Sequence, residues 1–156
     1  MASKLKKILL IGYGNPGRLD DGLGPAIAEI IEEKKLPNLT VDSDYQLMVE
    51  DAATIAEHDS VIFADAAVAG TEPFYFKPIE PKNEMSFSSH SAEPEQLVAL
   101  AQKLFRSEAK CYILGIRGYD FNEFGQKLSE KASENLQMAA EFITVAITEN
   151  KFEIVE

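Results

Sequence analysis

The stretch from Ile8 to Pro25 constrains the fold more than any other part of this chain. It opens with the apolar run Ile-Leu-Leu-Ile, which is typical of a buried parallel strand. Glycines follow at Gly12, Gly14 and Gly17, where a backbone can turn sharply. Pro25 suits the first turn of a helix, because its missing N–H is not needed there. The stretch therefore predicts a strand, a tight loop and a helix, the opening unit of an α/β fold.

Two adjacent carboxylates, Asp20 and Asp21, stand between this loop and the helix. In open α/β sheets, ligands bind at the carboxyl edge of the strands, where such a loop lies. Paired carboxylates at that edge indicate a cation. An aspartate here can also cap the helix, and Asp20 is the candidate for a capping or supporting role. The nearest basic residue is Arg18, so a cap alone accounts poorly for both charges.

The same glycines offer an alternative interpretation. Residues 12–17 satisfy the dinucleotide pattern G-x-G-x-x-G, which brings backbone N–H groups and a helix N-terminus to a pyrophosphate. Asp20 and Asp21 would repel that phosphate, and the predicted helix starts late, near Gly22. A nucleotide site is therefore the weaker alternative.

Apolar strands alternate with helical periodicity along the rest of the chain, which predicts the α/β class with a mainly parallel sheet. The expected strands span residues 5–12, 39–41, 60–64, 74–76 and 111–116. The expected helices span residues 24–35, 50–57, 93–106 and 128–148. Prolines on both sides place the strand at 74–76 at a sheet edge, and Ser129 is the expected N-cap of the last helix. The third helix is expected to carry Leu97, Ala101, Leu104 and Phe105 inward.

Composition excludes several classes of protein. At 156 residues the chain suits one domain spanning 1–156. Its net charge of −11 argues against a nucleic-acid partner, and no apolar run approaches the roughly 20 residues of a membrane span. The single Cys111 excludes an internal disulfide and a multi-cysteine zinc site. These features suit a cytoplasmic protein. With no repeat or heptad pattern to impose an oligomer, we expect a monomer.

Three residues fall where a metal site could form. Asp21 follows the first strand, Asp65 ends the predicted third strand, and His90 lies in the loop at 79–91. Strand ends at one sheet edge converge, so two carboxylates and an imidazole there predict an open divalent-metal site. Mixed N/O ligands suit nickel or zinc better than calcium. Taken singly, each has a more ordinary interpretation, as a turn aspartate or a solvated histidine.

The pattern G-x-G-N-P-x-R-x-D-D-G-x-G, from Gly12 to Gly24, resembles the opening motif of the [NiFe]-hydrogenase maturation endopeptidases. These proteases trim the C-terminal extension from the hydrogenase large subunit after nickel insertion. Residues 61–66, 90–100 and 124–129 resemble later segments of the family in the same order.

The resemblance implies a three-layer αβα fold (phosphorylase/hydrolase-like), with a twisted five-stranded sheet between helices. It implies Asp21, Asp65 and His90 as metal ligands, the same three residues that the spacing selects. The implied partner is a precursor of a [NiFe]-hydrogenase large subunit. The implied ion is Ni²⁺ carried by that precursor, with Zn²⁺ or a similar ion as a substitute in vitro. The expected catalytic residues are these same three together with Asp20, which is expected to orient a ligand or accept a proton.

The sequence departs from the family at two places. The commoner order is Asn-Pro-Leu-Arg-Gly-Asp-Asp, whereas here Gly17 and Leu19 are exchanged. Other branches carry Asp-Gly-Gly-Thr where this chain has Asp-Tyr-Gln-Leu at 44–47. A non-proteolytic metal- or nucleotide-binding relative is therefore an alternative function.

A second alternative is a peptidyl-tRNA hydrolase-like esterase, since the Gly-Asn-Pro-Gly of residues 14–17 resembles the opening of that family. Residues 19–22 lack the histidine of its Thr-Arg-His-Asn segment, and a charge of −11 is unsuited to tRNA.

Overall fold

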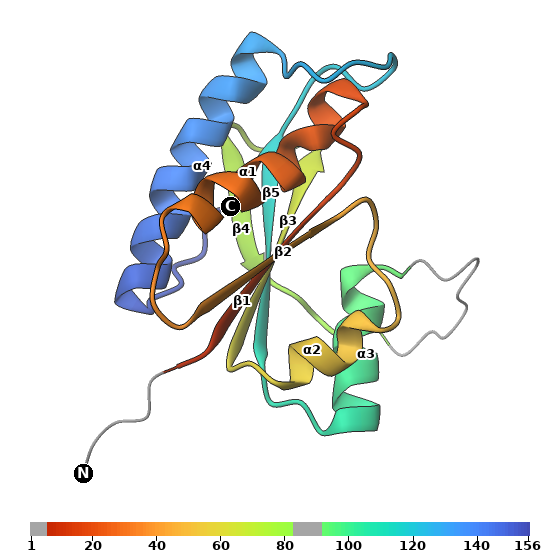
Figure 1. Cartoon of the computed structure of the whole chain (residues 1–156), viewed down its shortest axis with the longest axis vertical. Coiled ribbons are helices and arrows are strands. Elements are labelled where there is room, and N and C mark those ends of the chain that lie inside the picture. Colours follow the sequence, from red (N-terminus) through yellow and green to blue (C-terminus); the bar gives the residue numbers. More distant parts are fainter. Residues whose placement is uncertain (1–5, 83–91) are drawn as a thin grey trace.

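Five strands form one sheet in a computed structural model that describes residues 6–82 and 92–156 (Figure 1). The strands are β1 (Ile8–Tyr13), β2 (Leu39–Asp44), β3 (Ser60–Ala67), β4 (Phe74–Pro78) and β5 (Lys110–Arg117). They lie in the order β2-β1-β3-β5-β4, with β4 antiparallel to β5 and the other pairs parallel. The predicted α/β class, the mainly parallel five-stranded sheet and the edge position of β4 are confirmed.

Helices lie on both sides of this sheet. They are α1 (Leu23–Glu33), α2 (Asp51–Ala56), α3 (Pro94–Phe105) and α4 (Glu130–Glu149), with a short 3₁₀ turn, η1 (Leu19–Gly22), before α1. Figure 1 shows α1 and α4 on one side of the strands and α2 and α3 on the other. Ser129 is the N-cap of α4, as predicted, and its Oγ accepts a hydrogen bond from the N–H of Ala132. Within residues 6–82 and 92–156, no helix is both long and apolar enough to cross a membrane.

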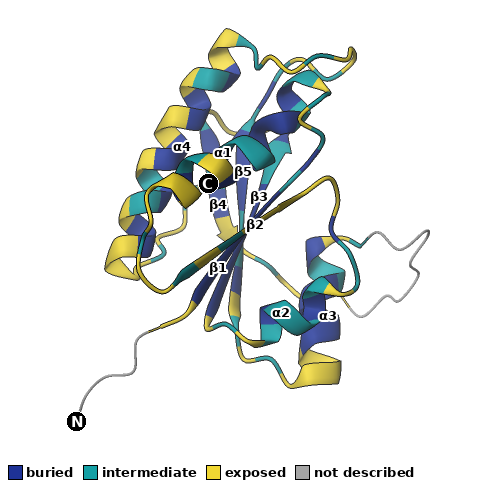
Figure 2. Cartoon of the chain, in the orientation of Figure 1, coloured by how far each residue is buried: buried dark blue, intermediate teal, exposed yellow. Residues whose placement is uncertain are grey.

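The central strands are mostly apolar because both of their faces are largely buried (Figure 2). Successive side chains of a strand point to opposite faces. Ile8 and Leu10 therefore pack with α1 and α4, whereas Leu9 and Ile11 pack with α2 and α3. The unbroken apolar run at the start of the sequence thus supplies two separate cores.

Glycines in the opening motif allow α1 to press against the sheet. A Cβ on Gly12 would lie 2.2 Å from the carbonyl oxygen of Gly24, and a Cβ on Gly24 would lie 2.2 Å from that of Tyr13. Any larger residue would push the helix away from β1. These glycines therefore place the start of α1, and the η1 turn before it, at the carboxyl edge of the sheet.

Several predicted details were wrong. β3 continues through Asp65 to Ala67, so Asp65 lies inside the strand and does not end it. β2 extends to Asp44, because pairing with β1 holds its polar residues in the ladder. Leu104 and Phe105 are 60% and 48% exposed, because the end of α3 extends past the elements it packs against (Figure 2).

Candidate active site

Asp21 lies in the η1 turn at the carboxyl edge of the sheet and is partly exposed. Its Oδ2 accepts a hydrogen bond of 2.9 Å from the N–H of Asn15, and the N–H of Gly14 donates to the carbonyl of Asp44 at 3.0 Å. A bound pyrophosphate would need such loop N–H groups for itself. Because they are already paired within the protein, this geometry disfavours the nucleotide interpretation.

Asp65 approaches Asp21 from β3. Its Oδ1 accepts a hydrogen bond of 2.8 Å from the N–H of Ala66. Burial and the nearby charge of Asp21 raise the pKa of Asp65 to about 6, although hydrogen bonding to the Ala66 N–H and the Tyr13 hydroxyl partly opposes that rise. Among the described residues, neither aspartate forms an ion pair. Two of the three predicted ligands therefore lie near each other, and no cationic side chain within residues 6–82 and 92–156 is paired with either.

Two tyrosines lie close to Asp65, with Glu95 near both of them, and none of the three was predicted from the sequence. Tyr13 is the last residue of β1, the strand next to β3, and burial together with the charges of Asp65 and Glu95 raises its pKa. Tyr75 of β4 covers Gly115, which pairs with Asp65 in the sheet, and burial, Asp65 and Glu95 raise its pKa as well. The alternation of side chains along β1 and β4 could have predicted both tyrosines. It places Tyr13 on the same face of the sheet as Ile11. It places Tyr75 on that face too, opposite to Phe74 and Phe76.

The third predicted ligand, His90, lies outside the described residues, so its place in the site stays a prediction. Among the residues that the structure describes, no group of three His, Cys, Asp or Glu side chains could hold a metal ion. Asp21 and Asp65 nevertheless suit such an ion chemically, because carboxylate oxygens without a cationic partner are ordinary ligands of divalent metals.

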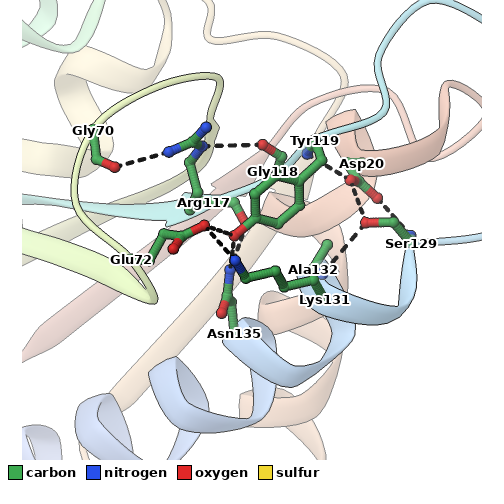
Figure 3. Close-up of polar contacts among 10 residues, drawn as sticks. All are labelled: Asp20, Gly70, Glu72, Arg117, Gly118, Tyr119, Ser129, Lys131, Ala132 and Asn135. Carbon is green, nitrogen blue, oxygen red and sulfur yellow. Dashed lines mark hydrogen bonds and ion pairs between the residues drawn. The ribbon is translucent and has the colours of Figure 1, made fainter.

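Asp20 points into the fold, away from this pair of carboxylates. It is fully buried, and its carboxylate accepts hydrogen bonds of 2.7 Å from the N–H groups of Tyr119 and Ser129 and from the Ser129 hydroxyl (Figure 3). It accepts a further hydrogen bond of 2.9 Å from the N–H of Asp120. Burial raises the pKa of Asp20, but these hydrogen bonds outweigh it, so the pKa lies below its ordinary value. Asp20 thus supports the fold by joining η1 to the start of α4 rather than by capping α1, whose N-cap is Gly22. A catalytic role for it stays a prediction.

The loop that Asp20 binds belongs to a larger polar network (Figure 3). The Tyr119 hydroxyl donates to Glu72 and accepts a hydrogen bond of 3.0 Å from Asn135. Lys131 forms an ion pair of 2.9 Å with the same Glu72. The network therefore ties the loops after β3 and β5 to α4, and through Asp20 to the turn that carries Asp21.

Comparison with protein-family models and with curated protein sequences gives no significant match. Solved structures do match. The [NiFe] hydrogenase maturation protease HycI from Thermococcus kodakarensis is 24% identical with a TM-score of 0.71, covering 93% of this chain and 94% of its own. The hydrogenase maturating endopeptidase HybD from E. coli is 21% identical with a TM-score of 0.69, covering 96% of each chain. A hydrogenase 2 maturation peptidase from a Thaumarchaeota archaeon is 19% identical with a TM-score of 0.66, covering 91% of this chain and 98% of its own. The resemblance inferred from the Gly12–Gly24 motif is thus confirmed in three dimensions: this chain has the fold of the [NiFe] hydrogenase maturation proteases.

Proposed function

We propose that this chain is an endopeptidase that removes the C-terminal extension of a [NiFe]-hydrogenase large-subunit precursor after nickel has been inserted, acting as a cytoplasmic monomer. The observation that carries the proposal is the approach of Asp21 and Asp65, without a cationic partner among the described residues, at the carboxyl edge of the sheet. The shared fold supports it, since the matching structures from T. kodakarensis and E. coli are named as maturation proteases.

In this proposal the metal ion belongs to the substrate. Asp21, Asp65 and His90 bind the nickel already inserted in the precursor, so a nickel-free precursor is not engaged. Hydrolysis of a peptide bond requires a polarised carbonyl group and an activated water molecule, and a divalent ion can supply both. Tyr13 would hold the Asp65 carboxylate toward that ion through its hydroxyl.

The chemistry of Cys111 supports a metal-assisted route over a thiol nucleophile. The side chain is buried, and burial raises the pKa of its thiol to about 12. A reactive cysteine instead needs a lowered pKa and access to substrate. Cys111 therefore serves as a small apolar residue of the core between the sheet and α3.

The test is the mass of a nickel-loaded large-subunit precursor from the same source, before and after incubation with this protein. We expect a discrete loss of the C-terminal extension with the nickel-loaded precursor and no loss with the nickel-free one. Asp21→Ala should abolish the cleavage. Asp59→Ala is the matched control, because Asp59 also accepts one backbone hydrogen bond, from Lys7 at 2.8 Å, but precedes β3 at the opposite edge of the sheet.

Full cleavage by Asp21→Ala would overturn the site assignment. An unchanged mass with wild-type protein and nickel-loaded precursor would overturn the proposed activity. Equal cleavage of both precursors would overturn the role of nickel while leaving the protease in place.

A further inference from the structure

A groove of about 580 Å³ lies beside the turn that carries Asp21. Its walls come from α1, from β2, from η1 and the loop before it, and from the loop before α4. Much of the lining is apolar, including Leu19, Pro25, Val41 and Leu128. An apolar hollow of this kind, open to solvent, is suited to receiving side chains of a partner.

The groove is also acidic. Glu29 and Glu32 lie one helical turn apart on α1, both are exposed, and both line it. No lysine or arginine belongs to its lining, and neither glutamate forms an ion pair within the described part of the chain. The groove therefore favours an occupant that carries positive charge.

The groove continues toward the candidate active site. Gly22, which directly follows Asp21, lines it. Pro16, Pro25 and Ser43 also line a second hollow of about 180 Å³, which extends to Gly14 in the same loop. A chain lying in the groove would therefore pass beside the Asp21 turn.

An open strand edge borders the groove. β2 is the outermost strand on its side of the sheet, and the carbonyls of Asn38 and Asp44 accept hydrogen bonds from β1. Because backbone groups alternate along a strand, those of Val41 and Ser43 point to the open edge. An extended polypeptide is the kind of partner that can pair with such an edge.

A nearby aromatic side chain is exposed on a well-held loop. Phe124 is 88% exposed. Its neighbour Gly125 donates a hydrogen bond of 2.8 Å to Gly17 and accepts one of 2.9 Å from Leu19. Phe124 is thus held near the groove, because Gln126 and Leu128 of the same loop line it. Rigid, exposed aromatic residues are common anchors in protein interfaces.

We propose that this groove, with Phe124 at its rim, docks an extended segment of the precursor polypeptide in which Lys or Arg residues alternate with apolar ones. The proposal rests on the proposed function and specifies how the substrate is recognised. The basic side chains lie against Glu29 and Glu32, an apolar one enters between Leu19 and Leu128, and Phe124 contacts the folded part of the precursor.

Cleavage kinetics with the nickel-loaded precursor test the docking. Phe124→Ala should raise KM about tenfold with kcat unchanged, because docking contributes binding alone. Glu29→Lys combined with Glu32→Lys should also raise KM, and the effect should shrink at high salt. The matched controls are Phe105→Ala at the end of α3 and Glu134→Lys with Glu141→Lys on α4, all at exposed positions away from the groove. A KM that is the same in groove and control variants would overturn the proposal.

Photo-cross-linking separates docking from cleavage. A benzophenone amino acid at position 124 should cross-link to the precursor, and one at position 105 should not. Cross-linking at position 124 without cleavage would support the docking surface and overturn the proposed protease activity. Cleavage with equal cross-linking at positions 124 and 105 would overturn the docking surface and support the protease activity. If the precursor is neither cleaved nor cross-linked, both proposals are overturned.

Discussion

Asp20 and Asp21 are neighbours in sequence, yet their carboxylates lie in two regions that differ in burial, hydrogen bonding and electrostatics. Asp20 is buried and accepts four hydrogen bonds from the loop before α4 and its N-cap, which lower its pKa. Asp21 accepts one backbone hydrogen bond and stands near Asp65, whose pKa is raised. The 3₁₀ turn separates the two side chains, because consecutive residues in it point about 120° apart. One charge is used to hold the fold, and the other is left available for a ligand.

Among the tests of this contrast, replacing Asp20 should have the largest effect. Asp20→Ala would leave four donors without their acceptor in a buried site, so we expect it to lower the free energy of unfolding by about 3 kcal/mol. Urea denaturation measures the change. Asp21→Ala and the control Asp59→Ala should each change stability by less than about 1 kcal/mol. A similar small loss of stability in all three variants would show that Asp20 does not stabilise the fold more than Asp21 does.

The second test uses pH to compare the two regions. The folded pKa of Asp65 is about 6, above its ordinary 3.8, so the folded protein binds this proton more tightly than the unfolded chain does. Stability from this residue is therefore lost as pH rises from about 4 to about 6 and stays lost above that range. Asp65→Asn, which keeps an acceptor for Ala66, should be more stable than wild type at pH 7 by about 2 kcal/mol and equal to it near pH 3.5.

The contribution of Asp20 to stability changes with pH in the opposite direction. Its folded pKa is lowered, so its contribution is present above the unfolded value of 3.8 and is lost as pH falls through the folded pKa. Urea midpoints measured between pH 2 and 7 check both directions, with the loss from Asp20 expected below about pH 3.8 and the change from Asp65 expected between about pH 4 and 6. A stability difference between Asp65→Asn and wild type that does not vary with pH would contradict the raised pKa of Asp65.

The third test is the binding of a divalent ion by the isolated protein. If Asp21 and Asp65 contribute ligands, Ni²⁺ at ten times its Kd should stabilise wild type by about 1.4 kcal/mol, which is a few degrees in Tm. Asp21→Ala and Asp65→Asn should lose the shift, whereas Asp59→Ala should keep it. An equal shift in every variant would show that Ni²⁺ binds elsewhere on the acidic surface.

The contrast also shows which parts of the structure the sequence could predict. The strand, loop and helix of the opening motif and the N-cap Ser129 depend on local patterns, and they were predicted correctly. The expectation that Asp21 and Asp65 lie near one another came from the rule that parallel strands end at one edge of a sheet, and the charge of Asp21 does act on Asp65. Their role as metal ligands stays a prediction. In contrast, the hydrogen bonds between Asp20 and Ser129 join residues 109 positions apart. No local pattern encodes such a contact, because it depends on how the loop before α4 packs over η1.

Tyr13 and Tyr75 were missed for a related reason. Each follows the alternation of its strand, which places it on the face of the sheet that carries Asp65. Their approach to Asp65 also depends on the strand order, which brings β1 and β4 to either side of β3 and β5. Hydrophobic periodicity identifies strands but does not say which strands are neighbours. Strand order was therefore the missing information, since the residue pattern itself was present.

The smallest test concerns Leu19, at the junction of the two regions. Its φ of 50° is left-handed, a conformation that costs a residue with a Cβ roughly 1–2 kcal/mol. The commoner order of the family motif has glycine at this position. Leu19→Gly should relieve that strain but free the unfolded chain and remove a side chain from the groove, leaving a net stabilisation of roughly 0.5 kcal/mol. Arg106→Gly, at a φ of 55° in the C-cap of α3, is the matched control away from the site. Urea midpoints compare the two variants. A gain in Arg106→Gly with a clear loss in Leu19→Gly would show that the Leu19 side chain stabilises the turn that holds Asp20 and Asp21 by more than its backbone strain costs.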